Sequence, residues 1–260
     1  MKTYREAIFY FLTKTITPLS EGTFTIDKTK YFIPFDPAKD ELQSRSKGSL
    51  LVEVQPFLIQ THHDLILLDT GLGFAGSDGV LQIHHNIVEA GFNPMDVTKV
   101  LMSHLHKDHA GGVGVEDKML QRQYLSFPHA VHYIQEKELE FAFQKGEPSY
   151  ITSELEILKG SDKVELLNGN GTIDNYIRYE CTGAHSPFHQ VFWISEGDEI
   201  VFFGGDDAPQ LQQMKSRFVA KYDYDGKKCM ELRHQWWAQG RQEHWTFLFY
   251  HDVKNPVSKN

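Results

Sequence analysis

Four side chains that can bind metal fall within six residues, in the segment His104-Leu105-His106-Lys107-Asp108-His109. Imidazole and carboxylate groups are the ligands of zinc and of similar divalent cations. The same groups are poor core material, because each buried polar ring needs a hydrogen-bond partner of its own. Ala110-Gly111-Gly112 follows directly, and small residues let the backbone crowd a site. The segment therefore predicts a metal-binding loop.

Three further residues stand where an α/β fold displays its site, just past an apolar strand-like run. These residues are His185, Asp206 and His251. One loop cannot complete the coordination of two cations, so we expect all three to converge on the histidine segment. Asp207 follows the same run as Asp206 and is the alternative to it.

Strands and helices must position these residues, and the chain contains both patterns. Apolar or β-branched runs predict strands within 9–35 and at 50–59, 65–69, 97–102, 131–134, 176–181, 190–194, 199–203 and 246–250. The polar turn 61–64 predicts a hairpin. Helical patterns cover 80–89, 136–143, 210–220 and 227–239. Strand blocks interleaved with helices predict an α/β protein with mixed sheets.

The organisation and charge of the chain limit the kinds of partner that we expect it to bind. Its 260 residues contain no linker or low-complexity tract, which favours one domain over 1–260 with residues 1–48 as an N-terminal β-rich extension. With 26 Lys and Arg against 35 Asp and Glu, the net charge is −9. An acidic protein repels phosphate backbones and anionic lipids. We therefore expect a small-molecule substrate, with no nucleic acid and no membrane as partner.

The N-terminus and the cysteines bear on location. Residues 1–14 hold a short apolar run, 7–12, between Glu6 and Lys14, which favours a strand over an export signal. No stretch approaches the ~20 apolar residues of a membrane span. Cys181 and Cys229 form no Cys-x-x-Cys motif, which fits a reducing compartment. The predicted location is the cytoplasm.

Six motifs, in this order and spacing, resemble those of the metallo-β-lactamase superfamily: Leu67–Gly71, Glu89–Val97, Ser103–Gly112, His185–His189, Gly205-Asp206 and Tyr250–Asp252. They run from about residue 50 to the end of the chain. The nearest branch holds N-acyl homoserine lactone lactonases and methyl parathion hydrolase. The resemblance implies an αββα sandwich of two mixed β-sheets flanked by helices, which is the metallo-β-lactamase fold. It also allows a homodimer.

The resemblance further implies a dinuclear metal centre with seven ligands. One cation would be held by His104, His106 and His185. The second would be held by Asp108, His109 and His251. Asp206 would bridge the two. Zn²⁺ is the expected metal, with manganese, iron or cobalt as alternatives.

Residues around these ligands receive supporting or structural roles. Asp69 resembles the family's aspartate that hydrogen-bonds a ligand histidine, a role that orients the ring. His189 is expected to support the site without binding metal. The remaining histidines lack the strand-end context and are interpreted as surface or structural residues: His62, His63, His84, His85, His129, His132, His234 and His244.

The implied chemistry is hydrolysis by a hydroxide bound to both metals, with Asp108 and Asp206 as catalytic residues. Asp206 would orient the nucleophile. The predicted substrate is a small-molecule lactone, ester or phosphoester. In the lactonases a tyrosine shortly after the bridging aspartate positions the substrate, and residues 206–210 contain none. The aromatic residues of 218–237 either wall an apolar pocket or pack under helices.

Two other functions use the same scaffold. An iron-dependent oxidoreductase of the flavodiiron type needs a flavin domain, for which no room remains after His251. A persulfide-dioxygenase-like enzyme would leave Asp108 and His251 without a role. An RNA-processing nuclease is disfavoured by the negative charge.

Overall fold

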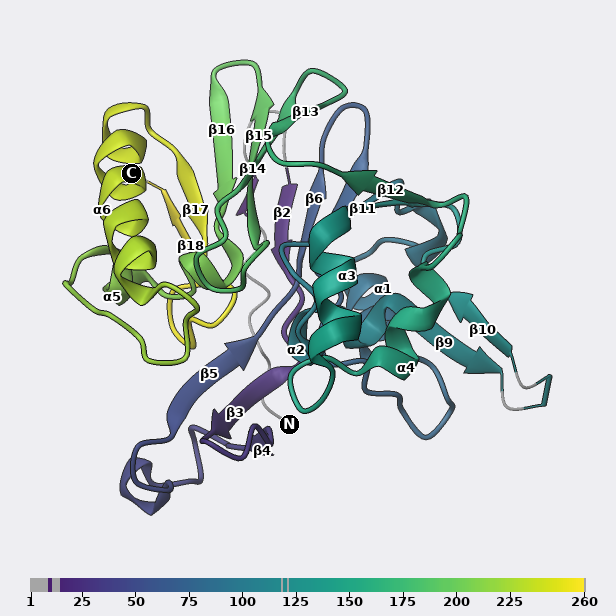
Figure 1. Cartoon of the computed structure of the whole chain (residues 1–260), viewed down its shortest axis with the longest axis horizontal. Helices are drawn as coiled ribbons and strands as arrows, with labels where there is room; N and C mark the ends of the chain where they lie inside the picture. Colours follow the sequence, from purple (N-terminus) through teal and green to yellow (C-terminus); the bar gives the residue numbers. More distant parts are fainter. Residues whose placement is uncertain (1–8, 11–14, 118, 121, 260) are drawn as a thin grey trace.

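A computed structural model of the chain describes residues 9–10, 15–117, 119–120 and 122–259. A larger and a smaller mixed sheet face each other, and helices cover their outer faces (Figure 1). The predicted αββα sandwich is confirmed. Of the strand predicted within residues 1–14, the two-residue strand β1 (Phe9–Tyr10) is described. The rest of that prediction lies outside the described residues.

The larger sheet has the order β1-β2-β6-β7-β8-β11-β12. Neighbours from β1 to β7 are antiparallel, whereas β7, β8, β11 and β12 run parallel. Its other strands are β2 (Thr15–Pro18), β6 (Phe57–Gln60), β7 (Leu65–Leu68), β8 (Lys99–Leu101), β11 (Val131–Gln135) and β12 (Val164–Leu167). The predicted hairpin around the turn 61–64 is the antiparallel pair β6–β7.

The smaller sheet has the order β13-β14-β15-β16-β17-β18, antiparallel except for the parallel pair β16–β17. Its strands are β13 (Gly171–Ile173), β14 (Ile177–Cys181), β15 (Gln190–Glu196), β16 (Glu199–Phe203), β17 (Thr246–Leu248) and β18 (Val257–Lys259). Because β14 and β16 both pair antiparallel with β15, they run in the same direction as each other and as β17. Their carboxyl ends therefore share one edge.

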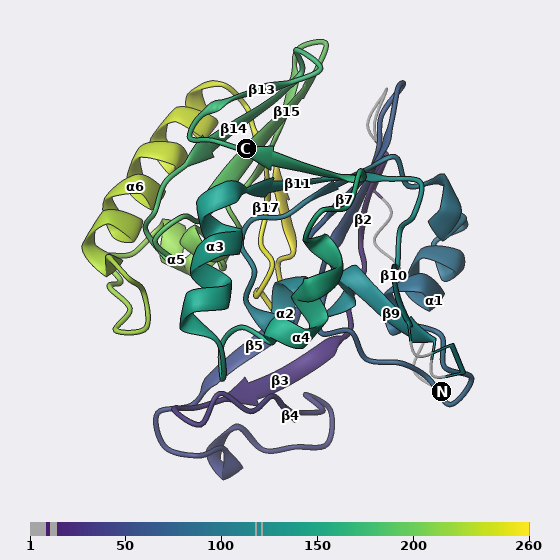
Figure 2. The same cartoon turned by 45° about the vertical axis from the view of Figure 1, so that its right-hand side comes forward.

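Alternating side chains of the buried strands build the layers. In β7, Ile66 and Leu68 face the smaller sheet, while Leu65 and Leu67 face the helices on the outside, as the two-residue period of a strand requires. The helices against that outer face include α1 (Gln82–Glu89) and α3 (Glu136–Lys145). Helix α6 (Gly226–Gln242) packs Trp236 on the outer face of the smaller sheet. Figure 2 shows α6 and α1 on opposite sides of the molecule.

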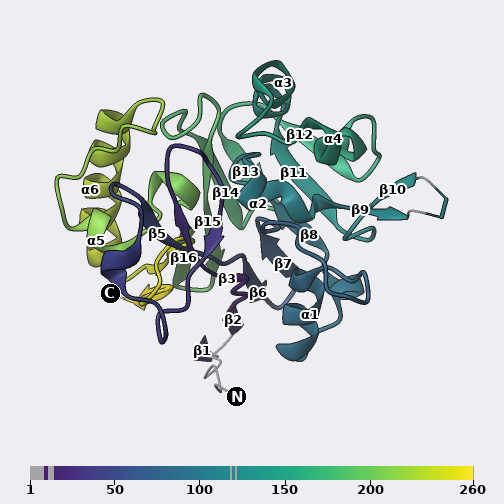
Figure 3. The same ribbon diagram turned by 90° about the horizontal axis from the view of Figure 1, so that it is seen from below.

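The predicted continuous strand 50–59 is wrong, because the chain changes sheets within it. Strand β5 (Leu50–Val54) pairs with β3 (Gly22–Ile26), which also pairs with β4 (Ile33–Pro34). These strands project below the sandwich (Figure 1), so β3 and β5 lie toward the viewer when the molecule is seen from below (Figure 3). The break falls at Gln55-Pro56, where proline offers no N–H to a ladder. The single domain over 1–260 with an extension to residue 48 stays a prediction.

The helix predicted over 210–220 is also shorter than expected. Helix α5 covers Leu211–Met214. Beyond it, the carbonyl oxygens of Ser216 and Phe218 accept hydrogen bonds from the side chains of His234 and Arg233 on α6. Side chains thus satisfy backbone groups that a helix would otherwise pair internally.

Several short elements go beyond those that the sequence patterns predict. They are the hairpin β9 (Gly114–Asp117) and β10 (Arg122–Leu125), helices α2 (Lys107–Ala110) and α4 (Thr152–Leu155), and strands β12, β13 and β18. The other predicted elements appear with slightly shifted ends. Among the helices of the described residues, none has the length and apolar character that a bilayer crossing requires.

Candidate metal centre

The seven predicted ligands meet at the edge where strands of both sheets end. His104 to His109 follow β8, and Asp108 and His109 lie in the short helix α2. The other three residues follow β14, β16 and β17, whose carboxyl ends share one edge: His185, Asp206 and His251. Strand direction therefore explains how residues far apart in sequence converge.

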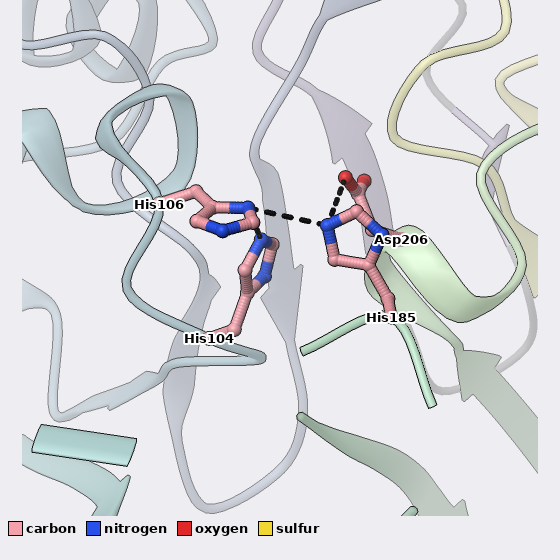
Figure 4. A group of neighbouring side chains, drawn as sticks. All are labelled: His104, His106, His185 and Asp206. Atoms are coloured by element: carbon pink, nitrogen blue, oxygen red, sulfur yellow. Dashed lines mark hydrogen bonds and ion pairs between the residues drawn. The ribbon is translucent and has the colours of Figure 1, made fainter. Parts of the chain in front are cut away.

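One group of facing side chains contains His104, His106, His185 and Asp206 (Figure 4). Nε2 of His104 lies 2.8 Å from Nδ1 of His106, and that Nδ1 atom lies 3.2 Å from Nε2 of His185. Oδ2 of Asp206 is 3.2 Å from Nε2 of His185. Three ring nitrogens and a carboxylate thus face a common point, as the ligands of a cation do.

A second group contains Asp108, His109 and His251. Oδ2 of Asp108 lies 3.5 Å from Nε2 of His251 and 3.7 Å from Nε2 of His109. The other oxygen of Asp206, Oδ1, is 3.0 Å from Nε2 of His251 and 3.2 Å from Nε2 of His109. Asp206 therefore presents one oxygen to each group, which is the geometry a bridging carboxylate needs.

Hydrogen bonds on the far side of four rings fix which nitrogen faces the centre. Nδ1 of His109 lies 2.8 Å from Oδ2 of Asp69, and Nδ1 of His185 lies 2.9 Å from Oδ1 of Asp223. Nδ1 of His251 lies 2.6 Å from the carbonyl oxygen of Glu53.

These carboxylate and carbonyl oxygens can only accept, so each Nδ1 carries the hydrogen and each Nε2 is left to the centre. Nδ1 of His104 lies 3.1 Å from the Ser103 hydroxyl, which itself donates to Asp69 at 2.7 Å. His104 is thereby oriented in the same way, with Nε2 toward the centre.

Buried polar atoms in the cluster fit a pair of cations. Within the described residues, Nε2 of His109 and Oδ1 of Asp206 are buried and make no hydrogen bond. Unsatisfied buried polar atoms are costly and rare in proteins. Burial lowers the pKa of His104 and of His106 well below the usual value, so both rings are neutral, the form that binds metal.

The pKa values of the other three histidines of the cluster shift in the opposite direction. Burial lowers the pKa of a histidine, but the Asp206 carboxylate outweighs it and raises the pKa of His109, His185 and His251. Burial acts to raise the pKa of Asp206, and these rings hold it well below its usual range. Without metal, the Asp206 carboxylate therefore favours the protonated form of these three rings. A cation would replace ring protons.

Asp207 and His189 support the centre from behind. The Asp207 carboxylate accepts from the backbone N–H of His185 at 2.7 Å and lies 3.1 Å from Nδ1 of His189. Nε2 of His189 accepts from the backbone N–H of Asp206 at 3.1 Å. Of the two adjacent aspartates, Asp206 is therefore the one that faces the cluster. The eight histidines interpreted as surface or structural residues lie outside both groups.

Sequence reasoning missed two contacts. Asp223, which orients His185, lies in a loop with no motif, and its neighbour Tyr224 donates its backbone N–H to the His185 carbonyl at 3.0 Å. Tyr250 stacks on His109 with ring centroids 4.0 Å apart and donates its hydroxyl to the Asp108 carbonyl at 2.6 Å. Only its position beside His251 pointed to Tyr250.

Two aromatic residues of 218–237 have different surroundings. Trp236 is buried against Phe202 and Trp193 in the core under α6. Tyr222 lies 6.1 Å from His185, measured between ring centroids, and is partly exposed. A tyrosine therefore lies beside the cluster, although it comes from a later segment of the chain than residues 206–210.

A cavity of about 710 Å³ lies under the projecting strands, lined by Glu21, Phe24, Phe35 and Phe74 among others. None of the seven predicted ligands is part of its wall. The cavity is therefore not evidence about a substrate that would bind at the cluster.

Comparisons with known proteins agree with this geometry. Residues 52–218 match the model of the metallo-beta-lactamase superfamily. The N-acyl homoserine lactonase AttM of Agrobacterium fabrum is 34% identical over 116 residues, which cover 40% of this chain and 38% of that protein. The N-acyl homoserine lactonase of Bacillus cereus is 27% identical over 191 residues, 64% of this chain and 70% of that protein. The match to AttM thus spans about two fifths of that relative's length.

Solved structures show the same fold. A probable metal-dependent hydrolase from Staphylococcus aureus superposes with a TM-score of 0.75 at 22% identity, covering 95% of this chain and 92% of that one. AidC, described as a dizinc quorum-quenching lactonase, superposes with a TM-score of 0.71 at 20% identity, covering 95% and 90%. At these identities the likeness concerns the fold.

Proposed function

Because the chain belongs to the metallo-β-lactamase superfamily, we propose that it is a metal-dependent hydrolase of a small-molecule lactone, carboxyl ester or phosphoester. The observation that carries the proposal is the position of Asp206, whose Oδ2 atom faces His185 while Oδ1 faces His109 and His251. A carboxylate held between two groups of ligands is suited to bridge two cations.

The proposed roles of the residues follow from this arrangement. Two bound cations would acidify a water molecule and polarise the group under attack. His104, His106 and His185 would hold one of them, and Asp108, His109 and His251 the other.

Asp206, shared by both groups, would orient the attacking water and carry its proton toward the leaving group. Asp69 and Asp223 would keep His109 and His185 in the tautomer that leaves Nε2 free.

Lactones are the first substrate class to test, because the curated relatives are named N-acyl homoserine lactonases. Zinc is the proposed metal, since nitrogen and carboxylate ligands suit it. A cytoplasmic location, from the cysteine usage, and a homodimer complete the proposal.

The test is a panel of lactones, carboxyl esters, phosphodiesters and phosphotriesters. It compares the wild-type protein, a fully chelated sample and Asp206→Ala, with Asp198→Ala in the exposed β15–β16 turn as the control. We expect hydrolysis of at least one class, lost on chelation and in Asp206→Ala but retained in the control. Turnover that persists after complete metal removal would rule out the proposed function.

A further inference from the structure

The buried carboxylate of Glu138, on α3, touches none of the clustered rings and yet joins the loops that carry three of them. Its Oε1 atom accepts from the backbone N–H of Leu105 and from the hydroxyl of Tyr150, both at 3.2 Å. Its Oε2 atom accepts from the hydroxyl of Ser186 at 2.9 Å. The residue is 1% exposed, so these three donors take the place of water.

Each partner adjoins a predicted ligand of the first group. Leu105 lies between His104 and His106 in the sequence, and Ser186 follows His185. The ring of Tyr150 lies 4.7 Å from that of His106, measured between centroids. One carboxylate therefore fixes the backbone of one ligand loop, a side chain of the other, and an aromatic ring that packs on a ligand.

The chemistry of the position argues against a role in packing alone. Burying a carboxylate costs several kcal/mol unless it is paired or fully hydrogen-bonded. Leu139, the residue after Glu138, places an apolar side chain in the core between α3 and the larger sheet. Within the described residues, Glu138 forms no salt bridge with lysine or arginine, so neither of these side chains offsets that cost. The three hydrogen bonds are the compensation, and all of them lead to the His104–His106–His185 group.

We propose that Glu138 is a positioning residue that locks the loop of His104 and His106 to the loop of His185, setting the spacing of these three rings. This inference rests on the metal centre of the proposed function. Glu138 itself would contact neither metal nor substrate. Removing a residue that orients metal ligands typically weakens metal affinity by about 10–100-fold.

The second group offers an internal comparison, because its supports are independent of Glu138. His109 is oriented by Asp69, and His251 by the carbonyl of Glu53. Loss of the Glu138 carboxylate should therefore weaken one group and spare the other. A general loss of folding stability would weaken both.

The experiment uses Co²⁺ as the probe in wild type, Glu138→Ala and Glu138→Gln. Glu53→Ala is the matched control, because Glu53 is a buried glutamate whose carboxylate accepts from the hydroxyls of Ser20 and Thr23, while its backbone carbonyl accepts from His251 of the second group. Competition with a chromophoric chelator gives the two dissociation constants. Paramagnetic NMR reports the shifted ring N–H signals of His104, His106 and His185 separately from those of His109 and His251.

We expect Glu138→Ala to weaken one of the two Co²⁺ sites by about 10–100-fold and to broaden or shift the three signals of the first group only. Glu138→Gln keeps an acceptor for Leu105 and Tyr150, so it should fold and weaken the same site by a smaller factor. Glu53→Ala should leave the first-group signals in place.

Two results would overturn the inference. If both Glu138 variants bind Co²⁺ with wild-type constants and signals, Glu138 has no positioning role, and the proposed function is unaffected. If the wild-type protein itself binds no Co²⁺ at these residues, the positioning role and the proposed function fall together.

Discussion

Oδ2 of Asp69 lies 2.8 Å from Nδ1 of His109, and both side chains are completely buried. The backbone of Asp69 has a φ of +57°, in the left-handed region that few side chains adopt. The same carboxylate also accepts from the backbone N–H and the hydroxyl of Ser103, both at 2.7 Å. Strained backbone of this kind persists where its surroundings hold it, often at a functional site.

Asp69→Asn tests this contact without changing the backbone preference, because asparagine tolerates positive φ as aspartate does. The amide offers one acceptor oxygen where three donors converge, so we expect metal affinity about tenfold weaker or more. Asp174→Asn is the control, since Asp174 also has positive φ, at 49°, but pairs with Lys99 far from the cluster. Equal affinities in both variants and wild type, measured by chelator competition, would refute the role.

Metal binding should release protons. Burial acts to lower the pKa of His109, His185 and His251, but the Asp206 carboxylate raises it. In the metal-free protein, these rings therefore retain protons as pH rises past the usual histidine range. A cation must displace them, and affinity should therefore fall as pH falls. Calorimetry at pH 7 in buffers of different ionisation enthalpy should detect release of about one proton or more per chain. Heats that are independent of the buffer would contradict this.

Stability should depend on pH through Glu21, whose pKa burial raises to about 7 from 4.5. The unfolded chain ionises this group first, so its contribution is fully present below pH 4.5 and is lost as pH rises through about 7. The shift corresponds to roughly 3 kcal/mol. In metal-free protein, Glu21→Gln should raise the free energy of unfolding at pH 8 and change it little at pH 4.5.

Urea denaturation at the two pH values measures this difference, with the exposed Glu140→Gln on α3 as the control. A gain of the same size at both pH values would show that ionisation of Glu21 is not its cause.

Arg233 stabilises the segment that follows Asp206. Its buried guanidinium donates to the carbonyl of Asp207 at 3.0 Å and to that of Phe218 at 2.6 Å. Arg233→Met should leave both carbonyls unpaired and lower the free energy of unfolding by about 3 kcal/mol. Arg241→Met, on the exposed face of the same helix, should change it by less than about 0.5 kcal/mol. Thermal and urea unfolding of the two variants distinguish these outcomes.

Sequence patterns located the cluster of histidines and aspartates because these residues are concentrated in motifs. His104 to His109 are contiguous, and His185, Asp206 and His251 each follow a strand that periodicity identifies. Strand direction then brings them together. The fold class was predictable for the same reason, since buried strands such as β7 are continuous apolar runs.

The rest depends on tertiary contacts that leave little local signal. Asp223 supports His185 from a loop that resembles any polar turn. Residues 215–220 have helical composition, but side chains of α6 satisfy their carbonyls in another conformation. The run 50–59 alternates like one strand, and only Pro56 marks the change of sheet.

The most direct test of the account is to count and locate the metal ions. Elemental analysis of the purified protein, combined with anomalous diffraction from its crystals, gives both answers in one sample. We expect two ions per chain, one among His104, His106 and His185 and one among Asp108, His109 and His251, with Asp206 between them. A single ion, or none, with Asp206 turned away from either group, would contradict it.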